Sequence, residues 1–73
     1  MVTIEKINRA YKIIGSKYRL EFTYIKHYIE TEEEFIKNIE NLCNTIGEEN
    51  IISIQFFNEE KNEISSCIIT YKE

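Results

Sequence analysis

The fold is decided by residues 31–47, which read TEEEFIKNIENLCNTIG. Thr31 and Glu34 have the spacing of a capping box, in which each side chain accepts a hydrogen bond from the backbone amide of the other residue. Apolar residues then recur every three or four positions, which is the stripe that an amphipathic helix packs against a core. The stripe consists of Phe35, Ile39, Leu42 and Ile46, flanked by Ile36 and Cys43.

Residues 3–15 repeat this pattern 32 positions earlier, with apolar residues at 4, 7, 11 and 14. The only two glycines, Gly15 and Gly47, each follow the end of such a pattern, where a helix often places a residue with positive φ. The repeat therefore predicts a first helix over residues 4–14. The alternative is a strand over residues 3–14 that leads into a hairpin turn at Gly15 and Ser16.

Three strands are predicted from alternating apolar residues, over residues 18–28, 51–57 and 63–71. Residues 58–62 are polar throughout and predict the loop of a hairpin between the last two strands. On the first two strands, the residues expected on the inner face are Tyr18, Leu20, Phe22, Tyr24, Ile52, Ile54 and Phe56, with Ile51 and Phe57 on the other face. On the last strand, Ile64 and Ile68 are expected opposite Cys67, Ile69 and Tyr71.

These elements predict one α+β domain spanning residues 1–73, in the order α-β-α-β-β, with a three-stranded sheet and two helices. The alternative order is ββαββ, with a four-stranded sheet and one helix. Because the strands carry apolar residues on both faces, one helix cannot cover the whole sheet. We expect the second face to meet either the other helix or another chain.

The composition favours a small binding protein that has a partner. The chain has 73 residues, a net charge of −4, and 42% apolar residues. A domain of this size buries only about 60% of its unfolded surface, so a homodimer or a bound partner is expected. The charge is uneven, because residues 1–29 carry +4 and residues 30–73 carry −8. Such a distribution suits self-association or docking on a charged partner.

No apolar run is long enough for a transmembrane helix, and the first residues have no signal-peptide pattern. The two cysteines lack metal-ligand spacing, so we expect a cytoplasmic protein with two buried free thiols. Ile, Glu, Lys and Asn make up 42 of the 73 residues. All four have A/T-rich codons, which fits an A/T-rich bacterial genome or its phages and other mobile elements.

Candidate catalytic groups are few, and we expect a non-enzymatic protein without cofactor or metal. His27 is the single histidine, and neither Cys43 nor Cys67 has a neighbour in sequence that would lower the pKa of its thiol. The acidic cluster of Glu30 and residues 32–34 raises the hypothesis of a metal site, which we do not favour. Its position is better explained by the capping box and the helix dipole, and the chain lacks the Asp residues of calcium loops.

The first functional hypothesis is binding to another protein, as a homodimer and as an accessory factor or inhibitor. Its candidate interface comprises the residues that are hardest to place in one core, which are Tyr28, Phe57, Ile69 and Tyr71. The second hypothesis is a small nucleic-acid-binding module that uses the basic, tyrosine-rich N-terminal segment. Its candidate contacts are Lys6, Arg9, Lys12, Lys17, Arg19 and Lys26. A third, a small-molecule site formed at a dimer interface, ranks well behind both.

Overall fold

The structure is a computed structural model that describes residues 1–59 and 62–73. Over these residues the chain forms an α+β domain with one α-helix, one short 3₁₀-helix and five strands. In chain order the elements are β1 (Val2–Asn8), β2 (Tyr11–Tyr18), β3 (Glu21–Tyr28), α1 (Glu32–Ile46), η1 (Glu48–Asn50), β4 (Ile51–Asn58) and β5 (Ile64–Lys72).

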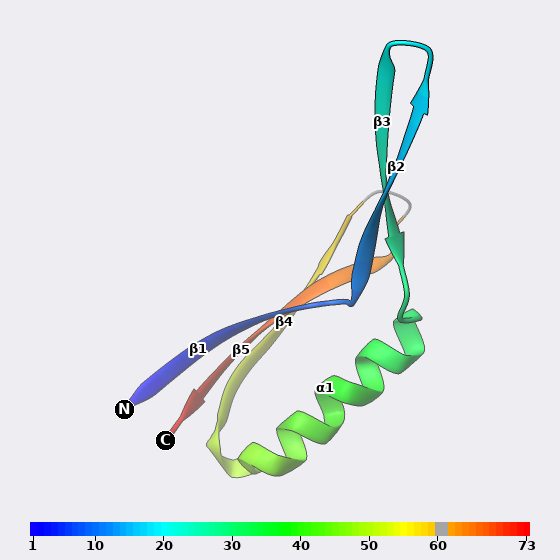
Figure 1. Cartoon of the computed structure of the whole chain (residues 1–73). Helices are drawn as coiled ribbons and strands as arrows, with labels where there is room; N and C mark the ends of the chain where they lie inside the picture. Colours follow the sequence, from blue (N-terminus) through cyan, green and yellow to red (C-terminus); the bar gives the residue numbers. More distant parts are fainter. Residues whose placement is uncertain (60–61) are drawn as a thin grey trace.

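The strands form two separate antiparallel sheets (Figure 1). Three of them make a sheet in the order β1-β5-β4, and β2 pairs only with β3. The helix α1 lies along one face of the three-stranded sheet, whereas the β2–β3 hairpin projects away from both (Figure 1). We call residues 11–28 the arm, and β1, α1, η1, β4 and β5 the body.

The core lies entirely in the body, between α1 and β5. It is formed by Phe35, Ile39 and Cys43 of the helix and by Cys67 and Ile69 of the strand, all of which are buried. Burial of each large apolar side chain contributes about 1.5–3 kcal/mol, so this small cluster holds the helix on the sheet. The partly buried residues that pack around it are Ile7, Leu42, Ile46, Ile51, Ile64 and Tyr71.

The helix begins and ends as its sequence predicts. The Thr31 hydroxyl accepts a hydrogen bond from the Glu34 amide at 3.1 Å, and the Glu34 carboxylate accepts one from the Thr31 amide at 3.3 Å. The capping box is therefore confirmed. At the other end, Gly47 has a φ of 98° and donates its amide to the carbonyl of Cys43. Only glycine adopts such a φ at little cost, which explains its place there.

The predicted first helix over residues 4–14 is wrong, and so is the count of two helices. Residues 2–8 and 11–18 are strands, separated by Arg9 and Ala10. Arg9 donates its amide to the Ser65 carbonyl, which extends the pairing of β1 with β5, and the chain then turns into the arm. The alternative order ββαββ has the right helix count but lacks one strand and joins the strands in a single sheet.

The alternative prediction for the N-terminal segment, a strand that leads into a hairpin, is correct in that a hairpin forms. The predicted position of its turn, at Gly15 and Ser16, is wrong. The turn lies at Arg19 and Leu20, and Arg19 has a φ of 58° at a position where two-residue turns often place glycine. Gly15 is instead in the middle of β2, opposite Tyr24. A Cβ at Gly15 would lie 3.1 Å from the Tyr24 ring, so this glycine makes room for the tyrosine that covers it.

The two C-terminal strands are confirmed. On β5, Cys67, Ile69 and Tyr71 lie toward the helix as predicted, but Ile64 also packs against the core, next to a register shift between Phe57 and Asn58, so its predicted place on the opposite face is wrong. On β4, Ile54 and Phe56 pair with Ile69 and Cys67 and face the helix. A register shift between Ile51 and Ser53 also brings Ile51 to that face, so its predicted outward position is wrong. The loop predicted at residues 58–62 falls partly on residues 60 and 61, which lie outside the described part of the chain.

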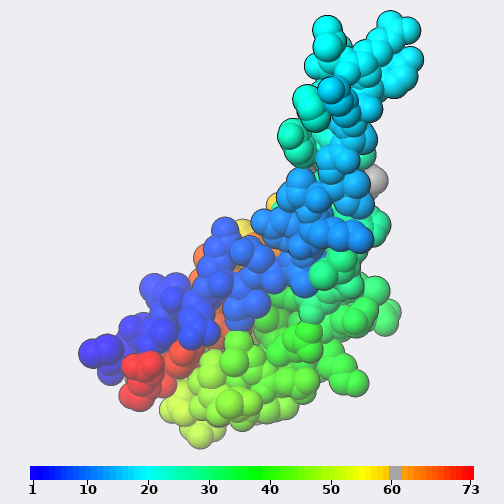
Figure 2. All heavy atoms as spheres, in the orientation of Figure 1, coloured from blue at the N-terminus to red at the C-terminus, as the bar shows by residue number. Residues whose placement is uncertain are grey.

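The molecule is long and narrow because the arm leaves the body (Figure 2). Its extents are 55 × 24 × 19 Å and its radius of gyration is 15.9 Å. A compact chain of this length would have a radius of gyration of about 11 Å. The accessible surface of 5879 Å² likewise exceeds by about 1,100 Å² what size scaling gives for a folded monomer. The surplus surface is available for contact with another molecule.

Candidate interaction surfaces

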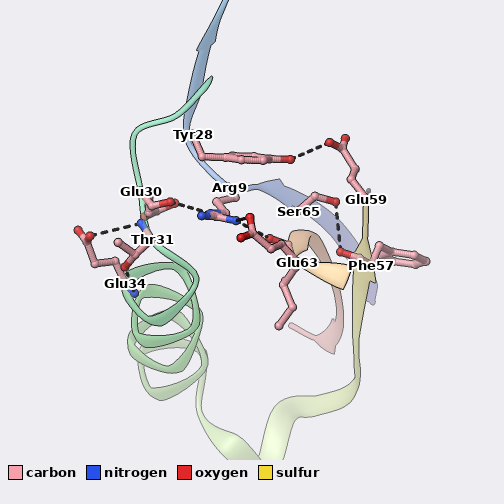
Figure 3. A network of polar contacts seen from close by, with 10 residues as sticks. Arg9, Tyr28, Glu30, Thr31, Glu34, Phe57, Glu59, Glu63 and Ser65 are labelled. Atoms are coloured by element: carbon pink, nitrogen blue, oxygen red, sulfur yellow. Dashed lines mark hydrogen bonds and ion pairs between the residues drawn. The ribbon is translucent and has the colours of Figure 1, made fainter. Parts of the chain in front are cut away.

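The arm is attached to the body by the side chain of Arg9, which is 7% exposed (Figure 3). Its Nε donates to the Glu30 carbonyl at 2.6 Å, and the same guanidinium donates to the Ile64 carbonyl and forms an ion pair with Glu63 at 3.2 Å. The ring of Tyr28 lies 4.2 Å from the guanidinium. One buried side chain therefore joins both ends of the arm to β5.

A second set of contacts fixes the arm through Glu59 at the end of β4 (Figure 3). Its carboxylate accepts hydrogen bonds from Lys26 at 2.8 Å and from the Tyr28 hydroxyl at 2.7 Å. These two bonds lower the pKa of Glu59, and the bond that Lys26 donates to Glu59 raises the pKa of Lys26. Burial and the bond to Glu59 raise the pKa of Tyr28. The direction of the arm is thus set by contacts at its base.

Beyond its base, the arm is exposed on both faces. All but one of its sixteen strand residues are exposed, and the exception is Tyr28. Several of these side chains are apolar, and Leu20 at the tip is 93% exposed. A two-stranded hairpin without a covering layer is only marginally stable in water. The exposed apolar residues of the arm are Tyr11, Ile13, Ile14, Tyr18, Leu20, Phe22, Tyr24 and Ile25.

One face of the arm gathers most of its aromatic rings, and we call it the aromatic face. The register of β2 and β3 places Tyr11, Ile13, Gly15, Lys17, Phe22, Tyr24, Lys26 and Tyr28 on it. The lysine nitrogens lie over rings of the same face, Lys17 at 5.3 Å from Phe22 and Lys26 at 4.3 Å from Tyr11. This face therefore presents flat apolar groups together with positive charge.

A groove lies between α1 and the edge strand β4, on the face of the sheet that carries the helix. It has a volume of about 520 Å³ and is lined by Ile36, Ile39, Glu40, Cys43, Asn44, Glu48, Ile51, Ile54 and Phe56. The helix leaves β4 partly uncovered, so Ile54 and Phe56 remain 40% and 43% exposed. Since β4 is the last strand of its sheet, its outer edge also lacks a strand partner within the described chain.

The rim of the groove is acidic. Glu40 and Glu48 line it, and four further glutamates lie in residues 32–50. This segment has six acidic side chains and one basic side chain, a net charge of −5. Burial raises the pKa of the Cys43 thiol, and the carboxylates of Glu48 and Glu40 raise it further. The groove therefore does not activate its cysteine as a nucleophile.

The four predicted interface residues do not lie on one surface. Tyr28 is half-buried at the base of the arm, and Phe57 is 41% exposed on the sheet face that lacks the helix. Tyr71 faces the helix side and donates its hydroxyl to Glu5. Ile69 is fully buried in the core, so it has no surface to offer. The structure therefore separates this set instead of bringing it together.

Four of the six basic residues predicted to contact nucleic acid lie on the arm: Lys12, Lys17, Arg19 and Lys26. Lys6 is exposed on β1, on the sheet face without the helix. Arg9 is buried and bonded within the chain, so it is not available to a phosphate. The sequence thus identified the basic segment, but only the four residues of the arm share one element, with Lys17 and Lys26 on its aromatic face and Lys12 on the opposite face.

The groups considered for catalysis and metal binding lie apart. His27 is on the arm opposite Lys12, whereas Cys43 and Cys67 are free, buried thiols in the body, as predicted. Glu34 belongs to the capping box, and Glu30 accepts a hydrogen bond from the Ala10 amide. Among the residues that the structure describes, no three His, Cys, Asp or Glu side chains are placed to hold a metal ion.

Sequence patterns did not reveal the groove or the free edge of β4. The alternating apolar residues of β4 predicted an inner face, and Ile54 and Phe56 do face the helix. That α1 covers β5 more fully than β4 is a property of the packing, which no local pattern records. The uneven charge distribution was the one sequence feature that indicated these surfaces. The arm lies within the basic residues 1–29, and the groove is lined by residues of the acidic segment 30–73.

Comparison of the chain with protein-family models, with curated proteins and with solved structures gives no match. In the part of the chain that the structure describes, no helix has the length and apolar character needed to cross a membrane.

Proposed function

We propose that this chain is a non-enzymatic protein that binds another protein through its arm. The observation that carries the proposal is the exposure of nearly every arm residue, including large apolar ones, on a hairpin held firmly at its base. Contiguous exposed apolar surface of this kind marks interaction sites. An accessory factor or inhibitor, of the kind that phages and other mobile elements encode, fits such a small cytoplasmic binding protein.

The composition of the arm favours a protein as its partner. Ile13, Ile14 and Ile25 have neither a ring for stacking on a base nor a donor for a phosphate, but they gain from burial against apolar protein surface. At the base of the arm, Lys26 is paired with Glu59 and Arg9 with Glu63. Two of the six predicted basic contacts are thus already engaged by carboxylates of the chain itself, which disfavours their use in neutralising a nucleic-acid backbone.

The test is affinity capture from a nuclease-treated host lysate, with wild-type protein and with the double variant Phe22→Thr/Tyr24→Thr. Threonine retains strand propensity, so this variant removes the rings while leaving the hairpin able to form. The matched control is Phe57→Thr, which removes one ring from the body. We expect a protein that is captured by the wild type and the control but not by the arm variant.

The captured protein is then purified and titrated with the same three chains. An affinity for the arm variant at least about tenfold weaker than for the control supports the proposal, because aromatic residues dominate the energetics of most interfaces. Equal binding by all three chains would refute a role of the arm.

Nucleic-acid binding is the second candidate, and the observation that favours it is the placement of four of the predicted basic contacts on one hairpin. The test is fluorescence anisotropy of labelled single-stranded and duplex oligonucleotides at about 50 and about 200 mM salt. Micromolar binding that weakens steeply with salt and is lost in Lys12→Ala/Lys17→Ala/Arg19→Ala would place this candidate first. Absence of binding at the lower salt concentration eliminates it.

A further inference from the structure

We propose that the partner of the arm is a second copy of this chain, and that each arm docks in the α1–β4 groove of the other copy. The proposal rests on the proposed function, because it assigns a partner to the same arm. Reciprocal exchange closes the assembly as a dimer with a two-fold axis, so both arms and both grooves are used once.

Charge complementarity is the first observation that supports this occupant. The arm carries Lys12, Lys17, Arg19 and Lys26 against a single acidic residue, Glu21, for a net charge of +3. The segment that borders the groove, residues 32–50, carries a net charge of −5. The two surfaces therefore attract each other between copies, and the rim glutamates meet the basic side chains of the arm.

The shapes and edges of the two surfaces also match. Among the residues that the structure describes, no strand pairs with the outer edges of β2 and β3 or with the outer edge of β4. All three strands have eight residues. An arm strand laid along β4 extends the body sheet by main-chain hydrogen bonds, as in other cases of strand addition. Its aromatic face then covers Ile54 and Phe56, the two groove residues that the helix leaves exposed.

The geometry of the base prevents the arm from reaching the groove of its own chain. Arg9 and Glu59 hold both ends of the arm against the end of the sheet at which it leaves the body. From there the arm projects away from the helix and from β4 (Figure 1). The groove can therefore receive an arm only from another molecule.

The available area is sufficient for a stable dimer. The surface of this chain exceeds that of a compact monomer of equal mass by about 1,100 Å². A standard interface buries about 800 Å² on each partner. Docking one arm and one groove on each chain thus removes an amount of surface comparable to the surplus.

The experiment exchanges the charges of the two surfaces at exposed positions. The arm variant is Lys17→Glu/Arg19→Glu, and the groove variant is Glu40→Lys/Glu48→Lys. Each variant alone brings like charges together in both interfaces of the dimer. Mixing the two restores opposite charges in both interfaces of the mixed dimer, because the altered arm meets the altered groove in one interface and the unaltered arm meets the unaltered groove in the other. Lys6→Glu/Lys72→Glu, on the sheet face without the helix, changes the net charge of the chain by the same amount as the arm variant.

Mass is measured by sedimentation over a concentration series, for each variant alone and for the equimolar mixture. We expect the wild type and the control to form dimers, and each exchanged variant alone to dimerise at least about tenfold more weakly. The mixture is expected to recover dimers of nearly wild-type affinity. Far-ultraviolet circular dichroism of each variant verifies that the fold is kept.

A second measurement reports on the groove itself, since Cys43 lines it and keeps 9% of its surface exposed, whereas Cys67 is 0% exposed. Alkylation of Cys43, followed by peptide mapping, is expected to slow by at least about fivefold as the wild type passes from monomer to dimer. The groove variant alone should show no such slowing at the same concentrations.

Three results would overturn the proposal. Dimerisation of the groove variant at wild-type strength would indicate arm-to-arm pairing, and dimerisation of the arm variant at wild-type strength would indicate pairing of grooves or sheet edges. A wild type that stays monomeric at all concentrations would exclude self-docking. If arm-dependent capture of a foreign protein persists in that last case, the proposed function stands while the second copy as partner is refuted.

Discussion

Arg9 connects the two parts of the molecule, because it lies between the last residue of β1 and the first residues of the arm. It is the only charged side chain that is buried among the described residues. Its donors reach the carbonyls of Glu30 and Ile64, which are 21 and 55 positions away in the chain. A guanidinium suits this position because its planar set of five donors can satisfy several acceptors at once.

Replacement of Arg9 by Lys is therefore expected to be costly. Lysine retains the charge, but its donors sit on one nitrogen and cannot replace the bonds that Nε and Nη1 of Arg9 make from separate positions. A part-buried carbonyl left without a donor costs about 1–3 kcal/mol. We expect the free energy of unfolding in urea to fall by about 1–3 kcal/mol. Arg19→Lys at the exposed arm tip is the control and should change it by less than about 0.5 kcal/mol. Equal effects of the two substitutions would contradict the role given to Arg9.

The two glycines are expected to respond differently to alanine. Gly47 has a φ of 98°, so Gly47→Ala should destabilise the protein by about 1–2 kcal/mol. Gly15 has no such φ and faces only an exposed tyrosine ring, which can shift by a few tenths of an ångström. Gly15→Ala should therefore stay within about 0.5 kcal/mol of the wild type. Thermal or urea unfolding of both variants measures the contrast.

At the scale of elements, the part of the fold set by local signals could be predicted. The capping box, the apolar stripe and Gly47 each act within a few residues, and they define α1 correctly. The alternation in β5 likewise predicted that Cys67 and Ile69 share the face that meets the helix, because they are separated by one full period of a strand. It failed for Ile64, which lies next to a register shift and packs against the same core.

The N-terminal third could not be predicted, because its apolar spacing has two explanations. Ile4, Ile7, Tyr11 and Ile14 fit one face of a helix, yet here they belong to two different strands. Ile7 faces the core on β1, whereas Ile14 is exposed on β2. What breaks the segment is the hydrogen bonding of Arg9 to residues far along the chain. No window of neighbouring residues contains that information.

The contact between the arm and Glu59 is expected to depend on pH. The pKa of Glu59 is lowered from its ordinary value of 4.5 and that of Lys26 is raised above 10.5, mainly by the hydrogen bond between them. The contact therefore contributes fully above the ordinary pKa of glutamate and is lost as the pH falls through the lowered pKa of Glu59. It is lost again only in strong alkali, as Lys26 deprotonates.

Carbon-13 NMR of the Glu59 carboxyl group measures this shift directly. We expect its titration midpoint below 4.5 in the wild type and closer to that value in Lys26→Met, which removes the stronger donor. Lys12→Met, on the opposite face of the arm, should leave the midpoint unchanged. A midpoint that is the same in all three chains would show that the contact does not form in solution.

At the scale of the whole molecule, shape is the property that distinguishes this chain from a compact domain. Small-angle scattering at concentrations where the chain is monomeric should give a radius of gyration near 16 Å, after allowance for hydration, and not near the compact value of about 11 Å. The distance distribution should extend to about 55 Å. A compact profile would mean that the arm folds against the body in solution.

The interaction surfaces can be recognised only from the arrangement of the whole molecule. The sequence indicated the two charged halves and the exposed aromatic segment, but it assigned Phe22 and Tyr24 to a core. In the structure they are 62% and 69% exposed, because the strand that carries them pairs, within residues 1–59 and 62–73, with β2 alone and is covered by no helix. A strand pattern states which residues share a face. It does not state whether anything covers that face.

The separation of arm and body has a consequence for how such a protein can change over generations. The core cluster contains no residue of the arm. Beyond its base, the arm is exposed and makes no packing contact with that cluster. Substitutions between residues 12 and 25 can therefore accumulate without loss of the helix or the three-stranded sheet. The body acts as a constant framework, and a new binding preference can arise at the tip by a few exchanges while the fold is inherited unchanged.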